Sequence, residues 1–173
     1  CVILIKLLDS IMIRYKKLFF WLPVLIWTGS LFFFSSQTAD ESTRLSGEMI
    51  RTLLVFIRPE FLQMTAAQQA QWVASLQHLV RNAAHFGSYF VLAMLCMNAL
   101  RQYPWRLARQ AALTLLLCMG YALTDELHQL FVAGRAFEMV DLGLDLGGTL
   151  LGLAVMLVIA GEKQSHIKRQ APR

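Results

Sequence analysis

Four long apolar stretches constrain the fold more than any other feature of the sequence. They cover residues 18–34, 83–100, 107–123 and 140–160. Each is close to the roughly 20 residues that an α-helix needs to cross the hydrocarbon core of a bilayer. Only 16% of the 173 residues are charged, against about 25% in an average soluble domain. We therefore predict an all-α, polytopic membrane protein with about four transmembrane helices.

The more polar segment between the first two stretches predicts two amphipathic helices that lie in the membrane interface. The second of them opens with Thr65 and Gln68, which match a capping box. The first ends at Pro59, which cannot continue a helix. Apolar residues recur in the first at three- and four-residue spacing, namely Leu45, Met49, Leu53 and Phe56. A lid over a substrate site is the alternative interpretation.

The chain is expected to form a single membrane domain over residues 12–160. Met12 begins a short basic segment before the first apolar stretch. We therefore interpret residues 1–11 as an upstream extension and residues 161–173 as a basic cytoplasmic tail.

The distribution of the 16 Lys and Arg residues predicts the orientation in the membrane. If the N-terminus is cytoplasmic, five of them lie outside: Arg44, Arg51, Arg58, Arg81 and Arg135. The other eleven then lie inside, and the positive-inside rule favours this arrangement. We expect a multi-pass protein of the cell (inner or plasma) membrane with both termini in the cytoplasm. The net charge of +5 comes from residues beside apolar stretches, a pattern typical of lipid contact, so no nucleic-acid partner is predicted.

Ionisable residues interrupt the apolar background between residues 121 and 152. Such residues are costly in a membrane and by default indicate a functional site. Asp125, His128 and Gln129 share one helix face, and His85 begins the second stretch at the same membrane level. Asp141 and Asp145 share a face at a helix start, where carboxylates are favoured. The ionisable residues of this segment are Asp125, Glu126, His128, Arg135, Glu138, Asp141 and Asp145.

Three interpretations of this polar cluster remain open. Carboxylate and imidazole groups can bind a divalent metal such as Mg²⁺, Mn²⁺ or Zn²⁺. Alternatively, a Glu or His acts as a general base while Arg135 holds an anionic group. In the third interpretation the groups form a structural ion-pair network, although five carboxylates against one Arg leave pairing incomplete. Asp125 and Glu138 are expected to be solvated. The metal-ligand candidates are Glu126, His128, Asp141 and Asp145.

The fourth apolar stretch carries glycines at GxxxG spacing, which lets a neighbouring helix approach closely. A partner transmembrane helix is therefore expected to pack on this face, which contains Gly143, Gly147, Gly148 and Gly152.

These motifs together resemble the VanZ-like family of membrane proteins. The resemblance rests on His85-Phe86 with Tyr89, on Glu126-x-x-Gln129, Arg135 and Asp141, and on Asp145-x-x-Gly148-x-x-x-Gly152. It implies a small multi-helix protein of the cell membrane, in a family whose namesake is associated with teicoplanin resistance. It also implies functional importance for His85, Glu126, Gln129, Arg135 and Asp141. Position 145 holds Asp where the family frequently has Asn.

We expect an outward-facing polar pocket that binds or acts on a lipid-linked or cell-wall component, with a link to glycopeptide resistance. Glu126 is predicted as base or ligand, and His85 and His128 as proton carriers or ligands. Arg135 is the anion holder, with Gln129 and Asp145 beside it in substrate binding and Asp141 orienting Arg135 or a metal. The alternatives are a non-catalytic scaffold or exclusion factor for an envelope assembly and a small proton-coupled transporter.

Overall fold

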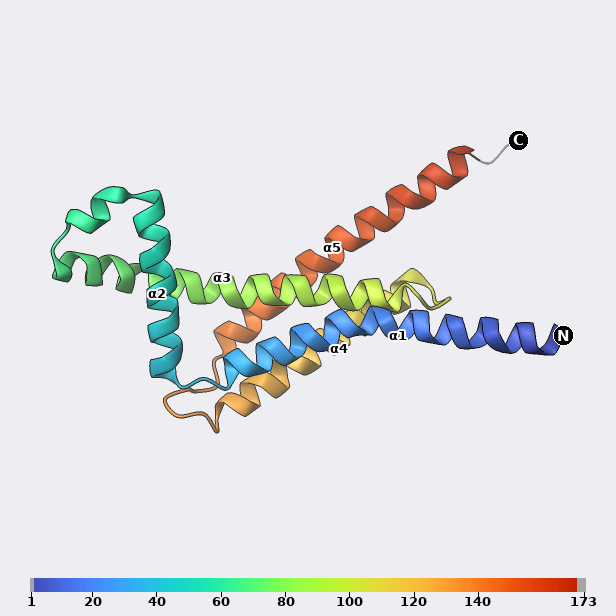
Figure 1. The fold of residues 1–173 in the computed structure, drawn as a ribbon, viewed down its shortest axis with the longest axis horizontal. Coiled ribbons are helices and arrows are strands. Elements are labelled where there is room, and N and C mark those ends of the chain that lie inside the picture. Colours follow the sequence, from blue (N-terminus) through green and yellow to red (C-terminus); the bar gives the residue numbers. More distant parts are fainter. Residues whose placement is uncertain (1, 171–173) are drawn as a thin grey trace.

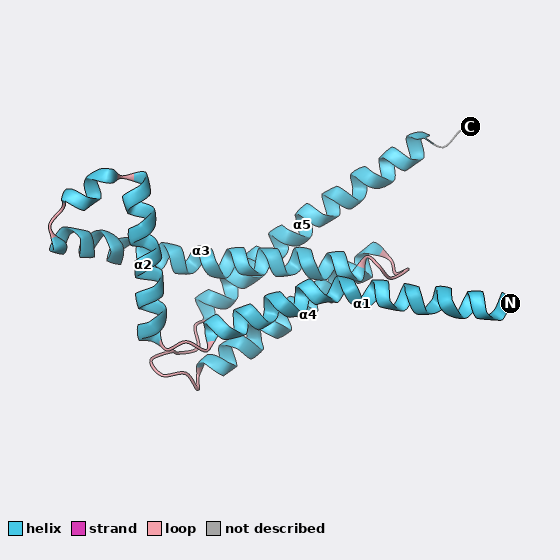
Figure 2. Cartoon of the chain, in the orientation of Figure 1, coloured by secondary structure: helices cyan, strands magenta, loops and turns pink. Residues whose placement is uncertain are grey.

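Over residues 2–170 the chain forms five α-helices and one short 3-10 helix. The computed structural model describes the backbone of residues 2–170 and the side chains of residues 15 and 17–161. Cys1 and residues 171–173, the two ends of the predicted extension and tail, lie outside the described residues. The elements are α1 (Val2–Ser35), α2 (Ala39–Ile57), η1 (Pro59–Gln63), α3 (Ala66–Leu100), α4 (Leu107–Gln129) and α5 (Met139–Gln170). Figure 2 shows how short the connections are.

Four helices are long and apolar enough to cross a membrane, which confirms the prediction of a polytopic helical membrane protein. The start of α1 and the end of α5 lie at one end of the bundle, and α2 and η1 lie at the other (Figure 1). This arrangement agrees with an even number of spans. The candidate spans cover Lys17–Ser35, Ala66–Leu100, Leu107–Gln129 and Met139–Gly161.

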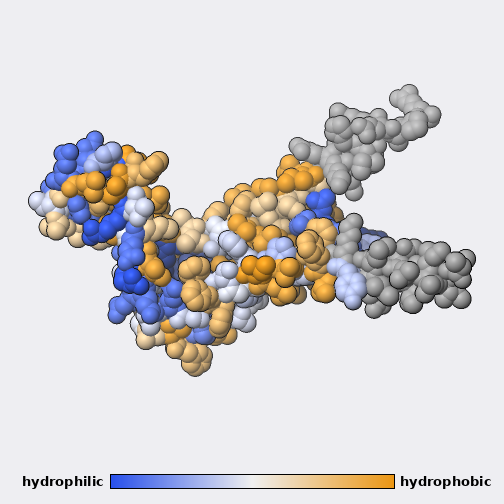
Figure 3. All heavy atoms as spheres, viewed as in Figure 1, coloured by the Kyte–Doolittle hydropathy of each residue, from blue (hydrophilic) through white to orange (hydrophobic). Residues whose placement is uncertain are grey.

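The second predicted amphipathic helix is not a separate element, because it continues directly into the second span as α3. No Gly or Pro stands between Thr65 and Ala83 to end the helix. At 35 residues, α3 is about 52 Å long, well beyond the roughly 30 Å of a hydrocarbon core. Its first part therefore extends past the other spans, where it joins α2 and η1 in the region of mixed polarity visible in Figure 3.

Both amphipathic segments begin at capping boxes. The predicted box at Thr65 is confirmed, since its side chain accepts a hydrogen bond from the backbone N–H of Gln68. A second box has Thr38 as the cap residue, with its backbone N–H 3.0 Å from Oε2 of Glu41. Such caps satisfy backbone donors that a helix start leaves without partners. The caps fix where α2 turns away from α1 and crosses α3 (Figure 1).

The pairing of α3 with α5 is the closest in the bundle and depends on glycine. A Cβ atom added to Gly148 would overlap the backbone carbonyl oxygen of Phe86, and one added to Gly152 would lie 2.6 Å from that of Phe90. Small residues allow this backbone approach between membrane helices. Gly148 and Gly152 therefore contact α3 of the same chain, whereas Gly143 has open space around it.

Helix α3 also supplies most of the central core. Its inward side packs against Val24 of α1 and against Cys118 and Ala122 of α4. The core residues that α3 contributes are Tyr89, Leu92, Ala93, Cys96 and Ala99. Because α3 contacts α1, α4 and α5, it fixes the height and rotation of the polar residues that the other helices carry.

Candidate functional site

A pocket of about 550 Å³ is lined by the end of α1, by α2 and α3, by the end of α4 and by the loop that joins α4 to α5. Its volume lies in the range typical of small-molecule sites. One wall is apolar and includes Leu31, Phe34 and Met49. The polar part of the wall includes Arg81, His85, Asp125, Gln129, Arg135 and Glu138. The site is thus amphipathic.

Arg81 joins α3 to the start of α5. Its Nη2 atom lies 2.7 Å from Oδ2 of Asp141 and 3.0 Å from Oε1 of Glu138. Asp141 is only 2% exposed, whereas Glu138 is 46% exposed. The ion pair between Arg81 and Asp141 is therefore better shielded from solvent than the one between Arg81 and Glu138. Glu138, expected to be solvated, is exposed and also paired.

His85 lies one turn further along α3 and faces two buried carboxylates. Its Nδ1 atom is 3.2 Å from Oδ1 of Asp145, and its Nε2 atom is 3.4 Å from Oδ2 of Asp141. Both ring nitrogens donate only when the imidazole is protonated. The geometry therefore fits an imidazolium held between two carboxylates, a state in which the ring has no lone pair for a general base.

Glu126 is 1% exposed and lies behind the loop rather than in the pocket. Its Oε2 atom accepts a hydrogen bond of 2.8 Å from the backbone N–H of Glu138, immediately before α5 begins. Glu126 thus holds the loop end against α4. Asp141 and Asp145 are buried as well: Asp141 contacts both Arg81 and His85, and Asp145 contacts His85.

The loop itself is docked on the start of α2. Gly134 has a φ of +74°, a conformation that costs a residue with a Cβ roughly 1 kcal/mol. The backbone N–H of Ala39 donates to the carbonyl oxygen of Ala133 at 3.2 Å, and a Cβ on Gly134 would press against Ala39 at 2.9 Å. This turn directs Arg135 towards the pocket.

Arg135 lines the pocket without a carboxylate partner among the described side chains. Its Nε atom donates to the carbonyl oxygen of Gln37 at 3.3 Å. Burial lowers the pKa of the Arg135 guanidinium, and the nearby charge of Arg81 lowers it further. An Arg side chain nevertheless stays charged at neutral pH. Arg135 therefore presents a positive charge that the described part of the protein leaves unpaired.

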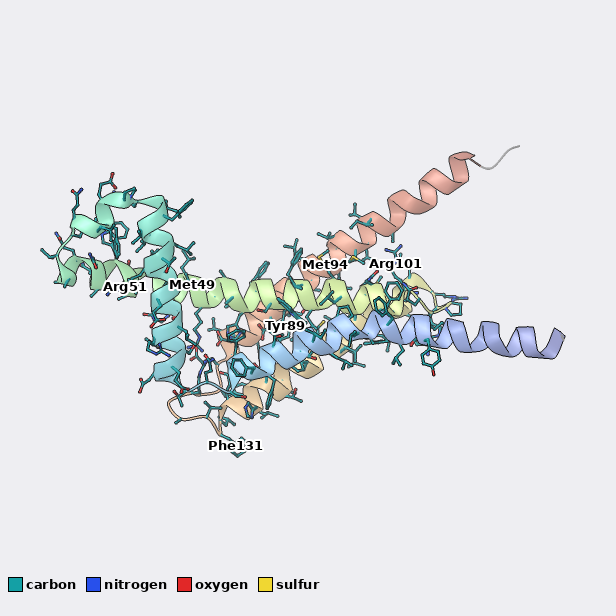
Figure 4. The ribbon with its side chains drawn as sticks, in the orientation of Figure 1. Met49, Arg51, Tyr89, Met94, Arg101 and Phe131 are labelled. Carbon is teal, nitrogen blue, oxygen red and sulfur yellow. The ribbon has the colours of Figure 1, made fainter. Side chains whose placement is uncertain are left out.

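Three residues that line the pocket carry buried oxygen atoms without hydrogen-bond partners. The amide nitrogen of Gln129 donates to Oδ2 of Asp125 at 3.2 Å and to Oγ of Ser35 at 3.3 Å. Asp125 Oδ1, Gln129 Oε1 and the hydroxyl of Tyr89 have no partner and are closed to solvent. Each such group costs about 1–3 kcal/mol. Asp125, expected to be solvated, is half-buried here, and Tyr89 lies inside the bundle (Figure 4).

The positions of these residues agree with the motifs that the sequence analysis singled out. A model of the VanZ/LLP1 family matches residues 20–160. The chain belongs to the VanZ/LLP1 family. Comparisons with curated proteins and with solved structures gave no match. Of the residues on which the resemblance rests, those at positions 85, 89, 129 and 135 line the pocket, and those at 126, 141 and 145 are buried outside its lining.

His128 lies apart from this VanZ/LLP1 pocket. Its Nε2 atom is 3.2 Å from Oγ of Ser36, and its ring lies 4.8 Å from that of Phe32. On an α-helix it is turned roughly 60° from Asp125, which is enough to face α1 instead of the pocket. Within the described side chains, no group of three or more His, Cys, Asp or Glu residues is placed to hold a metal ion. The structure therefore does not bring the four metal-ligand candidates together.

Arg81 is the site residue that the sequence analysis missed. It was counted only among the charges of the outer segment, before the second span. One signal was available, because Arg81, His85 and Tyr89 are spaced four residues apart and share a helix face. That signal requires α3 to begin well before Ala83. The predicted break between two separate helices concealed it.

Proposed function

We propose that the chain binds the anionic headgroup of a membrane-anchored cell-envelope component in this pocket. The observation that carries the proposal is Arg135, a guanidinium that lines the pocket and has no ion-pair partner among the described side chains. A guanidinium binds phosphate or carboxylate oxygens through two parallel hydrogen bonds. Arg81 and His85 line the same pocket, but carboxylates already pair with them, so Arg135 is the cation that remains for a ligand.

The apolar wall supports a ligand that is anchored in lipid. Leu31 and Phe34 belong to the last turns of α1, and Met49 belongs to α2. Leu31 and Phe34 lie within the first candidate span, which supports a pocket that borders the membrane. A phosphate on Arg135 would leave the first methylene groups of an acyl or polyprenyl chain against this wall, where burial of apolar surface stabilises the complex.

The buried carboxylates favour a binding role over acid–base chemistry. Glu126 holds the loop, Asp141 holds Arg81, and Asp145 holds His85. In this proposal the three are positioning residues, while Arg135 and Gln129 contact the ligand. This assignment replaces the roles of base and proton carrier that the sequence analysis considered for Glu126 and His85.

The proposed orientation places the pocket outside the cell and both termini in the cytoplasm. The distribution of Lys and Arg supports it. An outward pocket for an envelope lipid would connect this chain to glycopeptide resistance, because such antibiotics act on wall precursors at that surface.

Loss of the Arg135 guanidinium is expected to weaken binding of an anionic phospholipid. The measurement is native mass spectrometry of the full chain in detergent, titrated with phosphatidylglycerol. For Arg135→Ala we expect the dissociation constant to rise about tenfold or more, since a hydrogen bond to a charged group contributes about 1.5–3 kcal/mol.

Arg51→Ala is the matched control. Arg51, labelled in Figure 4, is exposed on α2 and bonds Gln69 at 3.1 Å. It does not belong to the residues that line the pocket. We expect a change below about twofold in this variant, because a single exposed charge contributes little. Equal losses in the two variants would indicate general charge attraction, and an unchanged Arg135→Ala would contradict the proposed site.

A further inference from the structure

Two opposite charges in the pocket have no partner within the described part of the chain. Of the Arg, Asp and Glu side chains that line it, Arg81 and Glu138 pair with each other, and Arg81 also pairs with Asp141. Arg135 and Asp125 are left without an ion pair, and they do not pair with each other. The pocket thus presents one cation and one anion, rather than a uniformly positive surface.

The anionic end is built from hydrogen-bond acceptors. The amide nitrogen of Gln129 already donates to Asp125 and Ser35. The Oε1 atom of Gln129, which can only accept, remains without a donor. Asp125 Oδ1 is likewise an acceptor, and the hydroxyl oxygen of Tyr89 can also accept. Gln129 is 1% exposed and Tyr89 is 3% exposed. These are buried acceptors without donors, adjoining one carboxylate.

We infer that the pocket takes a zwitterionic headgroup, with its phosphate on Arg135 and its primary ammonium at Asp125, Gln129 and Tyr89. This inference rests on the proposed function and names its ligand class as a phosphoethanolamine-type lipid. A primary ammonium has three N–H donors, which match the three acceptor oxygens. These oxygens are closed to solvent, so the proposal requires the side chains of Asp125, Gln129 and Tyr89 to rotate towards the pocket when the ammonium binds.

Charge complementarity gives the pocket its preference. A zwitterion meets both unpaired charges, whereas a purely anionic headgroup leaves Asp125 facing negative charge across the pocket. A juxtaposition of like charges discriminates against the wrong ligand. A quaternary ammonium carries the positive charge but has no N–H to donate, so it leaves the buried acceptors without partners.

The test compares three lipids with identical acyl chains on the full chain in detergent, by native mass spectrometry. We expect phosphatidylethanolamine to bind about tenfold more tightly than phosphatidylglycerol and phosphatidylcholine. In Asp125→Asn, which preserves the size of the side chain, the preference for phosphatidylethanolamine over phosphatidylglycerol should disappear. Asp40→Asn, the same change at an exposed position of α2 outside the pocket, should retain it.

The outcomes separate this inference from the proposed function. Equal binding of phosphatidylethanolamine and phosphatidylglycerol, with both weakened by Arg135→Ala, would overturn the zwitterion inference and leave the anion site standing. Equal binding of phosphatidylcholine and phosphatidylethanolamine would overturn the role of the three acceptors. If Arg135→Ala changes the binding of none of the lipids, both proposals fail. The comparison of lipids on the unmodified chain requires no variant to fold.

Discussion

Gly148→Ala is expected to lower the free energy of unfolding by about 3 kcal/mol, at the upper end of the usual cost of overpacking. The added Cβ would overlap the carbonyl oxygen of Phe86, a backbone atom that cannot rotate away. Helices α3 and α5 must therefore separate along their closest contact. Because α5 carries Asp141 and Asp145 while α3 carries Arg81 and His85, the separation also lengthens the ion pairs behind the pocket.

Gly143→Ala provides the matched control for this substitution. Gly143 lies on the same helix, but nothing is within 4 Å of the position its Cβ would take. Alanine is the better helix former, so this variant should remain within about 1 kcal/mol of the unmodified protein. The melting temperatures of both variants are measured by thermal unfolding in detergent, with size-exclusion chromatography as the readout of folded protein. Equal melting temperatures would contradict the assigned contact between α3 and α5.

Asp141→Asn is expected to lower the free energy of unfolding by about 2–3 kcal/mol. Removal of one partner from a buried ion pair costs about 3–5 kcal/mol. Here the loss is discounted because the Arg81 side chain remains 35% exposed and retains Glu138. His85 loses part of its support in the same variant, since its Nε2 atom also faces Asp141.

Glu138→Gln removes the other carboxylate that binds the same guanidinium. Glu138 is largely exposed, and exposed ion pairs contribute about 0–1 kcal/mol, so the expected loss is below about 1 kcal/mol. Urea or thermal denaturation of the two variants in the same detergent gives the comparison. If Glu138→Gln lowered the free energy of unfolding more than Asp141→Asn, burial would not be what makes the pairing of Arg81 with Asp141 the stronger one.

Much of the fold follows from local sequence patterns. The spans could be predicted because apolar length is a property of each segment by itself, and the box at Thr65 could be predicted because capping depends on residues three positions apart. The continuity of α3 could not be predicted with the same ease. The sequence becomes more apolar near Ala83, and this change suggested that one helix ends there and another begins. No Gly or Pro stands there to end the helix, so α3 continues.

The candidate site was only partly predictable because its contacts join distant segments. The pairing of Arg81 with Asp141 spans 60 residues of sequence, and no local spacing reveals it. Helical spacing placed Asp125, His128 and Gln129 on one broad face. The rotation of α4 against α1 and α3 is set by packing. It places Asp125 and Gln129 in the pocket lining but directs His128 to Ser36.

The most direct test of the central claim is made in cells that lack the native protein. Arg135→Ala and Asp141→Asn are expressed in turn, and membrane abundance is measured beside survival under glycopeptide challenge. If Arg135 binds ligand while Asp141 positions Arg81 and His85, Arg135→Ala is present at normal abundance but inactive, and Asp141→Asn is reduced in abundance. Full survival with Arg135→Ala at normal abundance would contradict the account.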